Sequence, residues 1–245
     1  PPCVNATRKR LTMSKPKAVI SLFDLTGQMV KPWADAGITC FLFDMQHDCD
    51  SIYPHMVTTG GDASTWADDI AEIFAAYDVA MVFGFPPCTS LAISGARHFQ
   101  AKAAANPNYR AEAMALVYMA RDIGEAYNVP YAIENPISVI SSEWRKPDHM
   151  FQPCDFGGYL PEDDQSPYPD IIPARDAYTK KTCLWTGNGF VMPAKRPVEP
   201  EKFTGKNGLN FSGPAWKLGG RSLRTKNIRS ATPRGFAKAV FAANS

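Results

Sequence analysis

The chain has 245 residues, of which 45% are hydrophobic and 20% charged, with a formal net charge of +2; this suits a globular protein with one large core. It contains no apolar run of the roughly 20 residues that a membrane helix needs, and no apolar stretch follows the basic residues 8–10, as a secretory signal would require. Its six cysteines are scattered without a C-x-x-C pair, which favours reduced thiols in a cytoplasmic protein over a disulfide framework.

The charge is unevenly distributed along the chain. From Thr179 to the end there are thirteen Lys and Arg against two acidic residues, a net charge of +11, whereas residues 1–178 carry −9. A basic part attached to an acidic body favours a polyanionic partner such as nucleic acid. A lysine-rich solvated surface would give the same pattern, so charge alone leaves both interpretations open.

Apolar strands alternate with amphipathic helices along most of the chain, which predicts an α/β protein with a doubly wound, mostly parallel sheet. The strands show little polar alternation, as expected where helices cover both faces of a sheet. We expect strands over 18–23, 38–43, 79–83, 131–133 and 178–185, and helices over 29–36, 64–77, 109–127 and 233–243. The stretches 91–105 and 187–226 are predicted to be loops, and the first could close over a substrate.

The first strand, helix and second strand form a βαβ unit that could bind a nucleotide. Residues 24–27 make the turn after the first strand, and Asp44 follows the second strand about 20 residues later, the spacing at which such units place an acid for a ribose hydroxyl. Only Gly27 of the usual glycine fingerprint is present. An ordinary βαβ unit with a capping Asp therefore fits the same pattern.

Two chemically reactive side chains follow the next two buried strands. Residues 86–88 (Pro-Pro-Cys) end one strand and place Cys88 just beyond it, and residues 134–136 (Glu-Asn-Pro) follow the other. Because the carboxyl ends of parallel strands meet at one edge of a sheet, we expect the thiol of Cys88 and the carboxyl of Glu134 to share a crevice. A lone cysteine after a strand is more often a small buried hydrophobe, so the pairing is what favours a catalytic site.

These motifs resemble those of the S-adenosylmethionine-dependent DNA cytosine-C5 methyltransferases, and most of all the compact members that bacteriophages carry. Residues 86–88 are similar to the nucleophile motif of the family and residues 134–136 to its glutamate motif. Residues 22–27 with 32–37 are similar to its first cofactor motif, and residues 230–239 look like the helix that completes its cofactor pocket. The motifs follow one another in the family's order over nearly the whole chain.

The resemblance implies a Rossmann-like methyltransferase fold with S-adenosyl-L-methionine as cofactor. It implies methyl transfer to C5 of cytosine through a covalent Cys88 adduct, with Glu134 assisting at N3 and the target base flipped out of double-stranded DNA. It also divides the chain into a basic N-terminal tail (1–17), a catalytic domain (18–186 with 228–245) and a reduced, loop-rich target-recognition lobe (187–227).

The resemblance further assigns binding residues. Those expected to hold the cofactor are Phe23, Asp24, Thr26, Gly27, Asp44, Met45, Asp62 and Pro86. Those expected to hold the substrate are Pro87, Ser90, Arg97, Asn135, Lys180, Lys181, Arg221 and Arg224. Lys226 and Arg229 are further candidates for phosphate contacts, and Arg97 and His98 are candidates for promoting ionisation of the thiol.

Neither the histidines nor the cysteines have the spacing of a zinc site, so we expect no metal. Two further interpretations stay open. The short span after residue 187 favours the same chemistry on a free cytidine nucleotide or on RNA. The incomplete glycine fingerprint of the first motif favours a catalytically idle protein that binds nucleic acid or the cofactor.

Overall fold

The computed structural model describes residues 14–48, 52–204, 208, 210–213 and 222–245. Its strands are β1 (Lys17–Leu22), β2 (Thr39–Phe43), β3 (Met56–Thr59), β4 (Asp78–Gly84), β5 (Tyr131–Pro136), β6 (His149–Phe151), β7 (Thr182–Gly187), β8 (Phe203–Thr204) and β9 (Asn210–Phe211). Its α-helices are α1 (Lys31–Asp35), α2 (Ala67–Ala76), α3 (Phe99–Ala105), α4 (Tyr109–Tyr127), α5 (Ile140–Glu143), α6 (Leu223–Ser230) and α7 (Arg234–Asn244). Short 3₁₀ helices are η1 (Ala63–Thr65), η2 (Cys88–Ser90), η3 (Ile93–His98), η4 (Pro153–Tyr159) and η5 (Ala174–Asp176).

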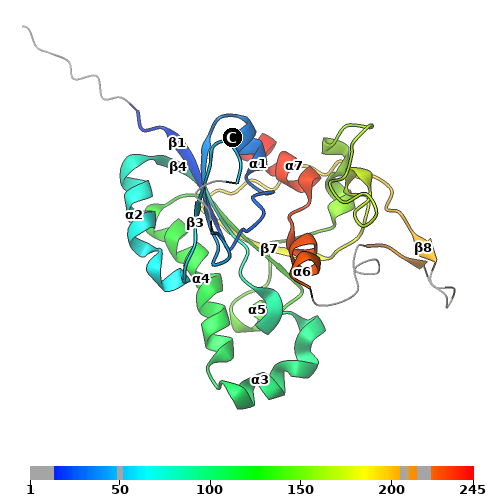
Figure 1. Cartoon of the computed structure of the whole chain (residues 1–245), viewed down its shortest axis with the longest axis horizontal. Coiled ribbons are helices and arrows are strands. Elements are labelled where there is room, and N and C mark those ends of the chain that lie inside the picture. Colours follow the sequence, from blue (N-terminus) through cyan, green and yellow to red (C-terminus); the bar gives the residue numbers. More distant parts are fainter. Residues whose placement is uncertain (1–13, 49–51, 205–207, 209, 214–221) are drawn as a thin grey trace, which may run out of the picture.

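Seven of the strands form one sheet in the order β3-β2-β1-β4-β5-β7-β6 (Figure 1). β7 pairs antiparallel with both of its neighbours, and the other six strands run parallel to one another. The connection direction reverses between β1 and β4, so the crevice beyond the carboxyl ends of these strands is where a doubly wound sheet binds ligands. β8 and β9 form a separate two-stranded sheet.

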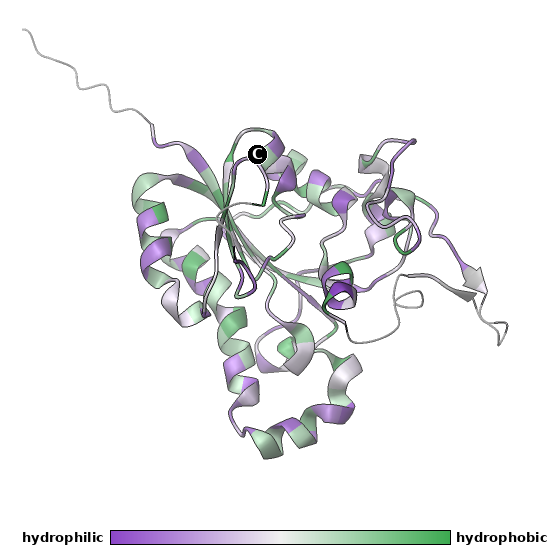
Figure 2. Cartoon of the chain, in the orientation of Figure 1, coloured by the Kyte–Doolittle hydropathy of each residue, from purple (hydrophilic) through white to green (hydrophobic). Residues whose placement is uncertain are grey.

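Helices cover both faces of the sheet, with α1 and α7 on one face and α2 and α4 on the other (Figure 1). Trp33 and Phe236 lie in the core on the first face, and Trp66 and Val117 lie in the core on the second. Figure 2 shows the hydrophobic residues concentrated in the strands and along the helix faces that meet them. Burial on both faces explains why the central strands lack polar alternation. No helix within the described ranges is both long and apolar enough to cross a membrane.

The predicted fold class, α/β with a mostly parallel sheet, is confirmed, and the predicted helix over 109–127 coincides with α4. The prediction of a loop over 91–105 is wrong, because the segment contains η3 and α3; its alanines are strong helix formers as well as small residues. The strand predicted over 178–185 starts later, at β7, and the strand predicted over 131–133 continues through residue 136, because β7 pairs with its whole length.

β3, β6 and α6 are among the elements that were not expected from the sequence. β3 and β6 are too short to show a pattern of their own, and each exists because a longer strand lies beside it. α6 occupies the end of the predicted loop 187–226 and spans the expected domain boundary at 227/228. Its first turn is capped by Ser222, whose hydroxyl accepts a hydrogen bond from the backbone N–H of Thr225.

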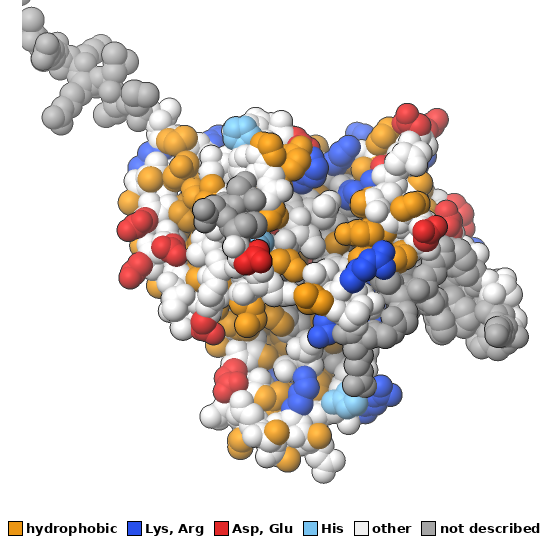
Figure 3. Space-filling view, in the orientation of Figure 1, with side chains coloured by type: hydrophobic (Ala, Val, Ile, Leu, Met, Phe, Trp, Pro, Cys, Tyr) orange, Lys and Arg blue, Asp and Glu red, His pale blue; other side chains and the backbone are white. Residues whose placement is uncertain are grey.

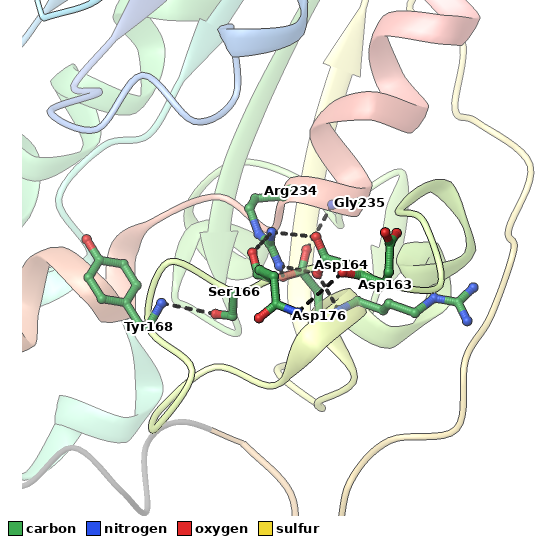
Figure 4. Close-up of polar contacts among 9 residues, drawn as sticks. Asp163, Asp164, Ser166, Tyr168, Asp176, Arg234 and Gly235 are labelled. Atoms are coloured by element: carbon green, nitrogen blue, oxygen red, sulfur yellow. Dashed lines mark hydrogen bonds and ion pairs between the residues drawn. The ribbon is translucent and has the colours of Figure 1, made fainter.

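A buried ion-pair cluster fastens α7 to the segment between β6 and β7 (Figure 4). The guanidinium of Arg234 lies 2.8 Å from Asp164 and 3.4 Å from Asp176, whose side chains are 7% and 2% exposed. The other carboxylate oxygen of Asp176 accepts a hydrogen bond from the backbone N–H of Gly235 at 2.8 Å, which also caps the N-terminus of α7. The cluster thereby holds the last helix in register with the sheet.

We expect Arg234→Leu to lower the free energy of unfolding by about 3 kcal/mol or more, because it leaves two buried carboxylates without their cation. Urea denaturation measures the loss. The control is Lys31→Met, which breaks the Lys31–Asp35 pair at 2.7 Å between side chains that are 38% and 46% exposed; it should cost less than about 1 kcal/mol. Equal losses in the two variants would show that the cluster does not stabilise the fold as described.

Candidate active site

Cys88 lies just beyond β4, at the carboxyl edge of the sheet. The chain leaves the strand through Pro86 and Pro87 and turns at once into η2, where the carbonyl of Cys88 accepts hydrogen bonds from the N–H groups of Leu91 and Ala92 at 3.0 and 2.8 Å. Among the cysteines that the structure describes, Cys88 is the exposed one. It lines a cleft of about 800 Å³ together with residues of η3 and α3 and with Arg229 of α6.

The structure brings the cysteine and glutamate motifs together. The side-chain amide of Asn135 donates a hydrogen bond to the carbonyl of Pro86 at 2.9 Å, which ties the end of β5 to the end of β4. Beyond this bond the two loops pair through their backbones, from Ile93 N–H to the carbonyl of Ile137 at 3.1 Å and from Val139 N–H to the carbonyl of Leu91 at 3.0 Å. The positions of Cys88 and Glu134 are therefore fixed relative to each other.

The carboxyl of Glu134 is buried, and its Oε1 atom has no hydrogen-bond partner in the described part of the chain. Burial raises the pKa of Glu134, while the positive charge of Lys180 opposes that rise. Desolvation of the sulfur, and then the negative charge of Glu134, raise the pKa of Cys88; the charges of Lys180 and Arg229 act to lower it. Lys180 thus lies within electrostatic reach of both the thiol and the carboxyl, and Arg229 within reach of the thiol.

Basic side chains surround the cleft. The ammonium of Lys102 donates hydrogen bonds to the carbonyl of Thr89 at 2.5 Å and to the hydroxyl of Ser90 at 3.2 Å, which braces the Cys88 turn against α3. Arg97 Nε lies 3.0 Å from Nε2 of His98, and both residues line the cleft. Figure 3 shows Lys, Arg and His side chains together on the protrusion that α3 forms.

The predicted substrate residues do not all reach the cleft. Arg97 lines it, Pro87 and Ser90 adjoin the lining residues Cys88 and Thr89 in the chain, and Asn135 is buried against the carbonyl of Pro86. Glu134 is not among the lining residues, and Lys180 is close enough to influence both Cys88 and Glu134. Lys181 is exposed, and Arg224 is exposed on α6 without lining the cleft. Arg221 lies outside the described residues.

The turn after β1 is held by the carboxylate of Asp24. This buried group accepts hydrogen bonds from the hydroxyl of Ser21 at 2.9 Å and from the N–H groups of Thr26 and Gly27 at 3.1 and 2.8 Å. Burial raises its pKa, and these hydrogen bonds oppose the rise. Gly27 has a φ of +64°, which favours glycine, and an added Cβ there would lie 2.9 Å from the Met56 sulfur.

The other predicted cofactor residues lie at the carboxyl ends of β1, β2 and β3. Phe23 adopts a φ of 60° and packs on Trp66 with ring centroids 5.4 Å apart. Asp44 is half-buried, and its Oδ1 accepts a hydrogen bond from the N–H of Gln46 at 2.9 Å. The next residue, Met45, is 73% exposed.

Asp62 is exposed and caps η1 by accepting hydrogen bonds from the hydroxyl and the N–H of Ser64 at 2.6 and 2.9 Å; these bonds lower its pKa. Pro86 is buried, and its carbonyl is the acceptor for Asn135. Three of the strand ends in this part of the sheet thus present an acidic or aromatic side chain.

Sequence reasoning missed Lys102, whereas Arg229 was among its candidates for phosphate contacts. Lys102 lies on α3, in a segment predicted as a loop, so its orientation toward Cys88 was not predictable. Arg229 lies just beyond the predicted loop 187–226, on α6, a helix that was not expected. The alanine-rich residues 101–105 were the one signal for α3. Within the described ranges, no group of three or more His, Cys, Asp or Glu residues is arranged to hold a metal ion. Comparison with protein-family models and with curated proteins gives no match for this chain.

Glu134→Gln removes a negative charge beside the sulfur, so we expect the pKa of Cys88 to fall and iodoacetamide to alkylate it faster between about pH 8 and pH 9. Lys180→Met should have the opposite effect, because it removes a positive charge. Peptide mapping by mass spectrometry separates Cys88 from the other thiols. Lys181→Met, the adjacent exposed residue, is the control and should leave the rate unchanged; an equal effect of Lys180→Met and Lys181→Met would contradict the proximity of Lys180 to the thiol.

Proposed function

We propose that the chain transfers a methyl group from S-adenosyl-L-methionine to C5 of cytosine in DNA, with Cys88 as nucleophile and Glu134 assisting at N3. The observation that carries the proposal is the convergence of the Cys88 thiol and the buried Glu134 carboxyl at the ends of adjacent parallel strands. A buried carboxyl oxygen without a hydrogen-bond partner calls for an explanation. A ring nitrogen of a bound base would supply the missing partner.

The topology supports the same proposal. The order β3-β2-β1-β4-β5 places the Asp24 turn and the Cys88 turn on the two sides of the switch point between β1 and β4. Doubly wound sheets bind nucleotides at this point. We therefore extend the fold assignment to the Rossmann-like methyltransferase type.

The chemistry follows from the electronic nature of the pyrimidine ring. C5 of cytosine is a poor nucleophile until a thiolate adds to C6, so Cys88 would form the S–C6 bond and the C5–C6 electron pair would become available at C5. Glu134, whose pKa is raised by burial, is suited to share a proton with N3 and so to limit the charge on the ring. After methylation, loss of the C5 proton re-forms the double bond and expels the Cys88 thiolate.

Lys180 contributes through its charge. It acts to lower the pKa of both the thiol and the carboxyl. Such a cation favours the thiolate that must form before addition to C6. We therefore assign to Lys180 the role of favouring ionisation at the site, and to Asn135 the role of positioning the two motifs.

The groups at the ends of β1, β2 and β3 fit an adenosyl group. Asp44 has a half-buried carboxylate suited to ribose hydroxyls, Phe23 offers an aromatic ring, and Met45 offers an exposed apolar side chain. S-adenosyl-L-methionine supplies the methyl group when it is bound. The carboxylate of Asp24 already accepts hydrogen bonds from its own loop, so its part is to shape the backbone at Thr26 and Gly27 rather than to contact the cofactor.

A smaller substrate is the second candidate. In the described part of residues 187–222, β8 and β9 are the only regular elements, and each is two residues long. Such a small lobe favours the same chemistry on a free cytidine nucleotide or on RNA as the alternative to sequence-specific DNA.

The test uses DNA that carries 5-fluorocytosine, because fluorine at C5 cannot leave as a proton does and the Cys88 adduct is trapped. With S-adenosyl-L-methionine present, we expect a covalent complex that mass spectrometry maps to Cys88, no complex with Cys88→Ser, and formation at least about 100-fold slower with Glu134→Gln. Fluorinated RNA and fluorinated cytidine monophosphate are tested side by side with the DNA. A wild-type protein that forms no adduct with any of the three, yet binds one of them, would be a binding protein instead of the proposed enzyme.

A further inference from the structure

We propose that Arg229, at the C-terminal end of α6, binds the phosphate group of the target nucleotide in the cleft beside Cys88. That the phosphate belongs to a cytosine nucleotide rests on the proposed function. The existence of an anion site at Arg229 rests on the geometry of the cleft alone.

Arg229 comes from a part of the chain remote from the Cys88 loop, yet both residues line the same cleft. The backbone carbonyl of Arg229 accepts a hydrogen bond from the ammonium of Lys180 at 3.2 Å. This bond fastens the end of α6 to the segment that leads into β7, whose neighbour β5 carries Glu134. Arg229 is thereby held at the site by a contact that does not use its side chain.

The guanidinium of Arg229 has no protein partner in the described part of the chain, where no carboxylate pairs with it and no acceptor takes its N–H groups. The other cations of the cleft are engaged. Lys102 donates to Thr89 and Ser90, and Arg97 lies against His98. Within the described part of the chain, Arg229 is therefore the cation of the cleft with all of its side-chain donors open to a ligand, whereas Arg97 has its Nε taken up by His98.

The charges of the residues that line the cleft favour an anionic ligand. None of its lining residues is acidic, and three basic residues besides Arg229 face it: Arg97, His98 and Lys102. A guanidinium with open donors matches a phosphate group, which it can bind through two parallel hydrogen bonds. The cleft, at about 800 Å³, lies within the size range of small-ligand sites and can hold a nucleotide.

An anion bound at Arg229 would affect Cys88 directly. The charge of Arg229 acts to lower the pKa of the thiol, so a phosphate that neutralises this charge disfavours the thiolate. The same phosphate also covers the approach to the sulfur. Alkylation of Cys88 by iodoacetamide therefore reports occupancy of the site without any methyl transfer.

The experiment measures how strongly inorganic phosphate, cytidine 5′-monophosphate and a cytosine-containing oligonucleotide protect Cys88 from iodoacetamide in the full chain. Each rate is compared with the ligand-free rate of the same variant. The matched control is Lys146→Gln, which removes one positive charge from an exposed position that does not line the cleft.

We expect equal protection in the wild type and in Lys146→Gln. Arg229→Gln should need at least about tenfold more of each anion, and Arg229→Lys an intermediate amount. Protection of Arg229→Gln at the wild-type concentrations, or no protection of the wild type by any of the anions, would overturn the inference. If the oligonucleotide protects at the lowest concentration, the phosphate belongs to a strand; if the monophosphate does, it belongs to a free nucleotide.

This outcome is independent of the proposed function. Loss of protection in Arg229→Gln together with failure of the 5-fluorocytosine adduct would leave the anion site standing and remove the methyltransferase. If the adduct forms but the anions protect Arg229→Gln as well as the wild type, the methyltransferase proposal would stand and the anion site at Arg229 would be ruled out.

Discussion

The hydrogen bond from the Asn135 side chain to the carbonyl of Pro86 joins the ends of β4 and β5, and the candidate site depends on it. It ties the loop that carries Cys88 to β5, the strand that carries Glu134 and that pairs with β4 and β7. The backbone pairing of Ile93 with Ile137 extends the connection beyond the sheet. Two reactive groups on separate strands are thus held at a fixed spacing, which is what chemistry on one planar ring requires.

Burial and nearby positive charges shift the pKa values of Cys88 and Glu134 in opposite directions. Desolvation raises the pKa of both Cys88 and Glu134, and so favours their neutral forms. Lys180 counteracts this for both groups, and Arg229 counteracts it for the thiol. A carboxyl with a raised pKa beside an ionisable thiol is the combination that the proposed proton sharing at N3 and thiolate addition at C6 would use.

The C-terminal part of the chain completes the site instead of forming a separate body. Arg234 anchors α7 through Asp164 and Asp176, and α7 in turn packs on the face of the sheet that α1 covers. The preceding helix, α6, ends at Ser230, one residue after Arg229, which lines the cleft with Cys88. From Thr179 onward the chain carries a net charge of +11, against −9 before it, so Arg229 brings a positive charge from the basic end of the sequence to a cleft lined by residues of the acidic part.

The sequence by itself determined the α/β class, the central strands, α4 and the placement of Cys88 and Glu134 at strand ends. Apolar runs and helical periodicity can be recognised from short stretches of sequence. They predict these elements correctly because the strands are buried on both faces of the sheet and the helices bury one face against it. Only the tertiary structure decided which basic residues reach the cleft. Lys180 and Lys181 are neighbours in sequence, yet one influences the thiol and the other is exposed. Likewise Arg224 and Arg229 share a helix but only Arg229 lines the cleft, because the direction of a side chain depends on how its helix or strand packs.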